Sequence, residues 1–112
     1  MAYNEPRTQQ VRKLLAYIPD VQEKKMFGSI GFIVNGKLCI GVGDHEDHVM
    51  MVRVGPTVYE EALQKKGVLP AIMRGREMKG YVFLLDEAVD TSEKLEYWVE
   101  LALAFNKTLV ES

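Results

Sequence analysis

The residues best suited to chemistry form one short string, Asp44-His45-Glu46-Asp47-His48. Imidazole and carboxylate groups bind divalent metals, so the string raises the possibility of a metal site. Consecutive residues of one loop cannot readily turn four side chains toward a single ion, and the string lacks the ligand spacing of known metal sites. We therefore predict a solvated turn and neither a bound metal nor another cofactor.

Cys39 is the only cysteine of the chain, which excludes an internal disulfide. A cysteine nucleophile needs a base within hydrogen-bond distance. In the strand pairing predicted below, Cys39 stands opposite Val52, and His48 is four residues further along, roughly 13 Å away at ~3.4 Å per residue. The spacing favours a buried, inert thiol. Since the chain also has no Ser/His/Asp arrangement, paired-carboxylate site or phosphate-binding glycine loop, we predict that it is not an enzyme.

The remaining polar candidates are cations, which suit binding better than catalysis. Residues 65–79 carry five basic residues and one acid, whereas residues 86–112 carry seven acids and two lysines. A solvated loop and a solvated helix face explain such segregation most simply. Together with methionines that can line an adaptable surface, the cations give our candidate partner-binding residues: Met26, Phe27, Arg53, Arg74, Arg76, Met78 and Lys79.

A hairpin around Asn35-Gly36 must position much of this set. Both central residues of a type I′ turn need positive φ, which Asn and Gly tolerate, so we predict that 30–34 pairs with 37–42. A two-residue loop places Val34 opposite Lys37, and by continuation Phe32 opposite Cys39 and Gly31 opposite Ile40. One face then carries Ile33, Leu38, Ile40 and Val42, and the other carries Ile30, Phe32, Val34 and Cys39. Because both faces are apolar, both need cover.

Hydrophobic periodicity and turn residues predict the other elements. The expected helices span 5–17, 57–65 and 91–109, with Asn4, Thr57 and Asp90 as N-caps and Gly67 as a left-handed end. The expected further strands are an edge strand over 23–28, then 48–54 and 81–85, with an irregular segment over 68–79 that holds a short strand near Ile72. The order predicts an α+β fold with a mostly antiparallel sheet of about five strands, long N- and C-terminal helices and one short middle helix.

The third strand extends the hairpin if Gly43 pairs near His48. Met50 and Val52 then join the face of Phe32, while Val49, Met51 and Arg53 join the face of Leu38.

The composition limits the classes of function. The chain has 112 residues, 47% of them apolar, which suits a single domain over 1–112. A formal net charge of −2 and a pI of about 5.7 give the whole molecule no attraction to nucleic acid or anionic membranes. The N-terminus lacks the apolar core of a signal peptide, and no run reaches transmembrane length. We therefore expect a soluble, cytoplasmic protein.

Several motifs, in this order and spacing, resemble the TfoX N-terminal domain family over nearly the whole chain. They are KKMFG at 24–28, Phe32, Asn35-Gly36-Lys37, Val52 to Gly55, Met78 to Tyr81, and the helix of Trp98 and Ala102. The resemblance implies an α+β domain similar to secretion-chaperone folds. The family namesakes are bacterial regulators that promote natural competence together with other transcription proteins.

The resemblance has two departures. The namesakes resemble this domain followed by a second, helical domain, whereas this sequence ends at Ser112. Ser29 stands where many relatives look like they carry a second glycine after Met-Phe-Gly.

The main hypothesis is a small non-enzymatic interaction or regulatory module that covers part of its apolar sheet with a partner protein or a second copy. The alternative is a nucleic-acid-associated regulator that uses the basic segment 65–79. Sequence-specific reading of DNA is not expected, since that segment lacks interleaved aromatic residues and a recognition helix. A ligand binder or enzyme with a cleft near Cys39, Arg53 and Met78 is a third hypothesis.

Overall fold

The computed structural model describes residues 5–26, 29–43, 45 and 48–111, which form six strands, three α-helices and one short 3₁₀ helix. Along the chain the elements are α1 (Glu5–Leu14), β1 (Val21–Met26), β2 (Ser29–Val34), β3 (Lys37–Val42), β4 (Met50–Arg53), α2 (Pro56–Leu63), β5 (Val68–Met73), β6 (Arg76–Leu84), η1 (Asp86–Ala88) and α3 (Ser92–Glu111).

The strands form one sheet in the order β1-β2-β3-β4-β6-β5, and every neighbouring pair is antiparallel. The predicted α+β class is confirmed, with six strands where about five were expected. The extra strand comes from 68–79, which is not irregular: it forms β5 and the start of β6 around a turn in which Arg74 and Gly75 have φ of +53° and +76°. The strand was not predicted because Pro70 lies within it, and a proline inside a run argues against a strand. A proline is tolerated there because β5 lies at the edge of the sheet.

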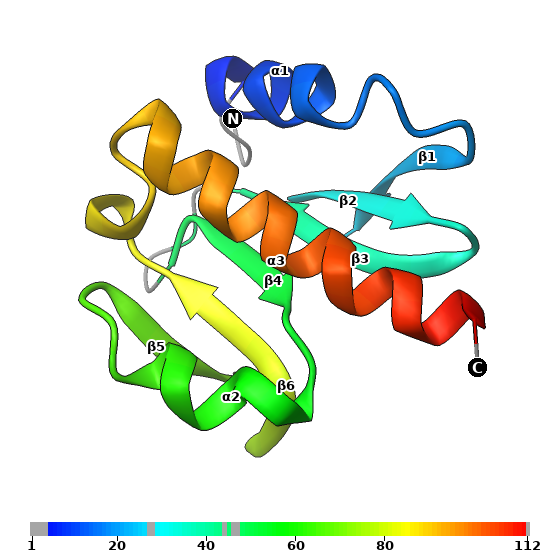
Figure 1. Cartoon of the computed structure of the whole chain (residues 1–112). Coiled ribbons are helices and arrows are strands. Elements are labelled where there is room, and N and C mark those ends of the chain that lie inside the picture. The colour runs from blue at the N-terminus through cyan, green and yellow to red at the C-terminus, as the bar shows by residue number, and fades with distance from the viewer. Residues whose placement is uncertain (1–4, 27–28, 44, 46–47, 112) are drawn as a thin grey trace.

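The helices lie on one side of the sheet (Figure 1). The long α3 crosses β3 and β4, α2 packs against β5 and β6, and α1 packs against α3. They share one buried core with the sheet residues Ile30, Phe32, Val34, Ile40, Val42, Met50, Val52, Val68, Val82 and Leu84. Cover on this side therefore comes from the chain itself.

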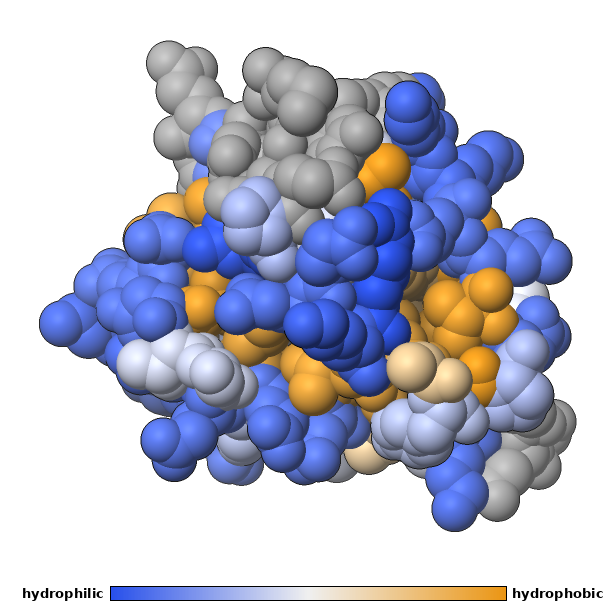
Figure 2. All heavy atoms as spheres, turned by 90° about the horizontal axis from the view of Figure 1, so that it is seen from above, coloured by the Kyte–Doolittle hydropathy of each residue, from blue (hydrophilic) through white to orange (hydrophobic). Residues whose placement is uncertain are grey.

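Figure 2 looks down on the molecule from the α1 side. Hydrophilic residues cover most of this view, and hydrophobic residues show in gaps between them and in a group at the right. Such a surface is typical of amphipathic helices, which turn their polar faces to water. Among the residues described, no helix combines the length and the apolar composition needed to span a membrane.

The central hairpin is confirmed, but its register changes halfway. Val34 pairs with Lys37 and Ile33 with Leu38, as predicted, whereas Phe32 pairs with Ile40 and Gly31 with Gly41. A β-bulge at Cys39 inserts one extra residue and turns the following side chains to the other face. The predicted pairing of Phe32 with Cys39 is therefore wrong, and Ile40 and Val42 lie on the face of Phe32.

The next pairing also differs by one residue. Val42 pairs with Met50 and Ile40 with Val52, so Cys39 is not opposite Val52. Met50 and Val52 nevertheless reach the face of Phe32 as predicted, because this shift and the bulge cancel.

All three helices have ends that differ from the predicted ones. The regular part of α1 ends at Leu14, three residues before the predicted end, because the chain tightens there: the Ala16 N–H bonds the Lys13 carbonyl. Helix α2 begins at Pro56 after Gly55 and has no side-chain cap, so Thr57 is not its cap. At α3 the Thr91 hydroxyl, not Asp90, accepts a hydrogen bond from the Lys94 N–H at 3.2 Å. Gly67 is left-handed as predicted, with φ of +81°, but α2 ends at Leu63 with Gln64 as its C-cap, so the predicted helix end at Gly67 is wrong. Asn4 lies outside the described residues.

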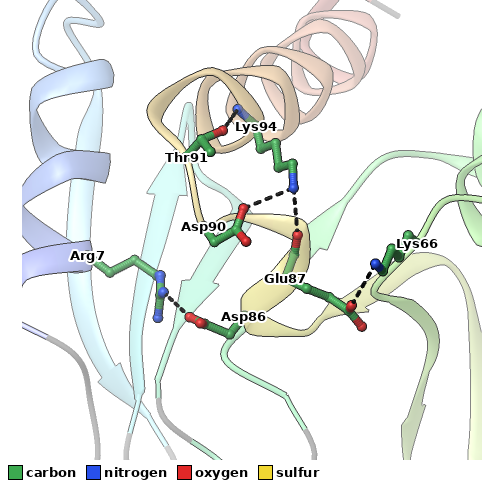
Figure 3. A network of polar contacts seen from close by, with 7 residues as sticks. All are labelled: Arg7, Lys66, Asp86, Glu87, Asp90, Thr91 and Lys94. Carbon is green, nitrogen blue, oxygen red and sulfur yellow. Dashed lines mark hydrogen bonds and ion pairs between the residues drawn. The ribbon is translucent and has the colours of Figure 1, made fainter.

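A surface network joins α1, η1 and the start of α3 (Figure 3). Arg7 pairs with Asp86 at 2.6 Å, and the Lys94 ammonium donates to Asp90 at 2.9 Å and to the Glu87 carbonyl at 3.1 Å. Lys66 lies 3.8 Å from the Glu87 carboxylate. Exposed pairs contribute little each, so the network mainly fixes how α3 leaves η1.

One buried amide holds the other end of α3 to the hairpin. Asn106, 4% exposed, donates to the Val34 carbonyl at 3.0 Å and accepts from the Asn35 side chain at 3.1 Å. Asn35 is the left-handed residue of the turn, with φ of +53°. These two hydrogen bonds attach α3 directly to the hairpin turn. They help to fix which face of the hairpin meets the core.

Candidate functional site

The face of the sheet opposite the helices contains an open apolar pocket of about 280 Å³. Its floor is the cross-strand pair formed by Gly31 of β2 and Gly41 near the end of β3. Neither residue has a side chain to fill the space above the backbone. Around this floor stand Leu38, Met51 and Phe83, from β3, β4 and β6.

The rim of the pocket includes Met73, which lies at the end of β5, the far strand of the sheet. The register between β5 and β6 shifts between Pro70 and Ile72. Register shifts bend and twist a strand pair, and Met73, which follows this shift, lines the same pocket as Leu38 of β3. Methionine side chains are flexible and adapt to different contacts. Met51 and Met73 therefore make this part of the pocket adaptable.

The polar end of the pocket is formed by Ser29 and two histidines. The Ser29 hydroxyl lies 2.6 Å from His45 Nε2. The His45 ring stacks on His48 at 4.6 Å between centroids, and His48 stacks on Phe83 at 3.7 Å. Both histidines are half-buried, so these two members of the string are packed against the sheet and not fully solvated.

The structure gives no support to a metal site among the residues it describes. In that part of the chain no three His, Cys, Asp or Glu side chains come together in a way that would hold an ion. Asp44, Glu46 and Asp47 lie outside the described residues, so the absence of a metal stays a prediction.

Cys39 lies in the core on the helix side, 1% exposed, in the same cluster as Ile40. Burial raises the pKa of Cys39 to about 12, and the positive charge of Arg53 opposes that rise. At neutral pH the group is therefore a thiol, which is a poor nucleophile. His48 lines the pocket on the other face, so the two residues do not form a nucleophile and base.

We expect Cys39 to react slowly with a thiol reagent such as 5,5′-dithiobis(2-nitrobenzoate) in the native protein at pH 8. Its pKa of about 12 keeps the fraction of reactive thiolate very small, and its burial keeps the reagent away. Unfolding exposes the thiol and returns its pKa to the ordinary range. The measurement is the labelling rate with and without denaturant, which should rise by at least about a hundredfold on unfolding, because the burial and the raised pKa are both lost. Rapid stoichiometric labelling of the native protein would contradict the buried position.

The candidate partner-binding residues do not gather at one place. The Arg53 guanidinium lies over the rings of Tyr81 at 5.1 Å and Phe105 at 5.4 Å. Arg74 and Arg76 are exposed at the β5–β6 turn, and further along β6 Met78 is half-buried and Lys79 exposed. Phe27 and the side chain of Met26 lie outside the described residues.

The basic segment is divided in space. Lys65 and Lys66 precede β5, at the opposite end of that strand from Arg74 and Arg76. Lys65 lies over the Tyr97 ring at 5.0 Å, and Lys66 approaches Glu87. These two lysines border a shallow hollow of about 410 Å³ that also contains Glu87 and Glu93. The five cations of 65–79 therefore do not form one continuous surface.

Sequence reasoning missed the pocket, although one signal was present. Glycine inside a strand often marks a close approach of another group, and Gly31 and Gly41 stand in two adjacent strands. Their pairing became visible only with the bulge at Cys39, which sets Gly31 opposite Gly41.

Comparison with known proteins gives one match. A family model described as the TfoX N-terminal domain matches residues 13–106. The search of curated proteins and the search of solved structures gave no significant match.

Proposed function

Because the chain belongs to the TfoX N-terminal domain family, we propose that it is a non-enzymatic regulatory module. It binds an acidic partner protein through the helix-free face of its sheet. The finer form of the proposal is a role beside other transcription proteins, as in the competence regulators after which the family is named.

The observation that carries the proposal is the asymmetry of the sheet. One face packs against α2 and α3 in a single core, whereas the other holds the apolar pocket and no helix among the described residues. Leu69 of β5, which pairs with the pocket residue Phe83, is 40% exposed. Open apolar clefts of this kind often receive the central side chains of a protein interface.

The charge at the rim indicates the character of the partner. Met73 lines the pocket, and Arg74 and Arg76 follow it in the exposed turn. A partner with acidic residues beside an apolar contact would complement this arrangement and would be steered toward it. The other cations of 65–79 lie apart from these two arginines, so the segment does not present the continuous basic surface that nucleic-acid binding would need.

The absence of an enzymatic role is also part of the proposal. Burial holds the pKa of Cys39 at about 12, and its side chain lies in the core. None of Cys39, Arg53 and Met78 lines either of the two pockets described above.

The test is affinity capture from the native host with Met51→Lys compared with the wild-type chain. Met51 lies at the centre of the helix-free face and is half-buried. A lysine there leaves the core side unchanged but places a charge in the interface, so we expect recovery of the specific partner to fall at least tenfold.

The matched control is Tyr17→Lys, which adds the same charge at a residue that follows α1 and is 73% exposed. Equal recovery by the two variants would refute the proposal. Sedimentation of the purified wild-type chain separates the remaining case: a dimer abolished by Met51→Lys would mean that a second copy, not another protein, covers this face.

A further inference from the structure

We infer that the pocket on the helix-free face receives a tryptophan side chain of the partner, flanked by acidic residues. This inference rests on the proposed function and specifies the chemistry of the contact. It uses three features of the pocket: its size and glycine floor, its ring-lined wall, and one hydrogen-bonding group at its end.

The size fits two fused rings. A cavity of roughly 150 Å³ holds one benzene ring, and this pocket has about 280 Å³. The paired glycines leave backbone without side chains beside Leu38 and Met51, and the Met51 methyl group lies 3.9 Å from the place of a Cβ on Gly41. A planar group can lie on such a floor, whereas a branched aliphatic side chain would leave part of the space empty.

The walls favour an aromatic occupant. The Phe83 ring begins a stacked row that continues through His48 to His45. Met51, the cross-strand partner of Phe83, and Met73 also line the pocket, and their thioethers make favourable contacts with aromatic rings. These rings and thioethers therefore attract an aromatic ring more strongly than an aliphatic chain of the same size.

The hydrogen-bonding end selects among aromatic groups. The Ser29 hydroxyl is already paired with His45 Nε2 at 2.6 Å. A hydroxyl has one proton and two lone pairs, so its oxygen keeps at least one free lone pair whichever of the two groups donates. An indole N–H is a donor only, and it would satisfy this acceptor. Phenylalanine has no such group.

The flanking charge follows from the rim. Arg74 and Arg76 are exposed beside Met73, and Arg74 is held in the turn with φ of +53°. Acidic residues on either side of the tryptophan would lie near these cations. Their contribution is electrostatic and should weaken as salt is added.

The test uses a seven-residue peptide, Gly-Asp-Asp-Trp-Asp-Asp-Gly, with capped ends. Binding is measured by isothermal titration and by shifts of the methionine methyl resonances. We expect saturable binding, with shifts at Met51 and Met73 and none at Met78, which does not line the pocket. Leucine in place of tryptophan should weaken binding at least tenfold, and lysines in place of the aspartates should weaken it several-fold at low salt.

Two variants test the position of the ring. Gly41→Leu should abolish detectable binding, because its side chain fills the hollow above the floor. Gly41→Ala is the milder partner: its added methyl would meet Met51 Cβ at an ordinary 3.7 Å, so the variant should fold and bind more weakly. Leu69→Ala, on the same face but outside the pocket, should bind like the wild-type chain.

The hydrogen bond has a test of its own. Ser29→Ala should weaken the tryptophan peptide about fivefold and leave a naphthylalanine peptide, which lacks the N–H, unchanged. A peptide that does not saturate, or that binds Gly41→Leu as well as wild type, would overturn the inference. If capture of the partner still depends on Met51 in that case, the proposed function stands and only the tryptophan is wrong; if it does not, both fail.

Discussion

Gly55→Ala is expected to lower the free energy of unfolding by about 2–5 kcal/mol. Gly55 precedes α2 with φ of +90°, a conformation that residues with a side chain adopt only with strain. A Cβ built at this position would lie 2.3 Å from Phe105 Cδ1, so the ring of α3 would have to move. The variant thus combines backbone strain with overpacking, and denaturant unfolding measures the loss.

Gly75→Ala separates the two causes. Gly75 also has positive φ, +76°, but a Cβ there would meet nothing within 4 Å. This variant should lose only about 1–2 kcal/mol, the cost of the left-handed backbone. Comparing Gly55→Ala with and without Phe105→Ala then gives the coupling between the two sites. Equal losses in the two glycine variants would contradict the close contact of α3 with the start of α2.

Phe32→Ala is expected to lower the free energy of unfolding by about 3–5 kcal/mol. Phe32 is fully buried at the centre of β2, and it pairs with Ile40 beneath the helices. Whole domains are stable by only about 5–15 kcal/mol. The single change should therefore leave the protein marginally folded, as thermal and denaturant unfolding will show.

Ile33→Ala is the matched control, one residue along the same strand. Ile33 points to the helix-free face and is half-buried, so its truncation should cost less than half as much. Equal losses at Phe32 and Ile33 would mean that both faces of β2 are equally covered in the free chain. That result would also remove the basis of the proposed docking surface.

The parts of the fold that depend on short-range signals were predictable. Asn35-Gly36 set the hairpin and its first two pairs correctly, because positive φ at both turn residues is a local requirement. The long α3 followed from its hydrophobic periodicity. The bulge at Cys39 could not be predicted, since no local signal such as a glycine marks it, and its effect is to place Ile40 beside Phe32 in the core.

The site was less predictable than the fold, for a similar reason. The residue types from Asp44 to His48 suggested a metal site. In the structure the two histidines of this string instead contact Ser29 and Phe83, which are far away in sequence. The pocket floor depends on the pairing of Gly31 with Gly41, which a one-residue change of register destroys. Of the seven candidate partner-binding residues, Arg74 and Arg76 lie next to the rim by sequence, whereas Arg53 packs between two aromatic rings.

Pro70 has a consequence for the behaviour of the protein at high concentration. The outer strand β1 includes Glu23, Lys24 and Lys25, and charges of this kind discourage a further chain from adding to a sheet. The opposite border, β5, reads Val-Leu-Pro-Ala-Ile-Met and has no charged side chain. Its proline removes one amide donor from the row that an incoming strand would need. Pro70 therefore protects the uncharged edge β5 against polymerisation. At the other edge, β1, three charged residues provide this protection.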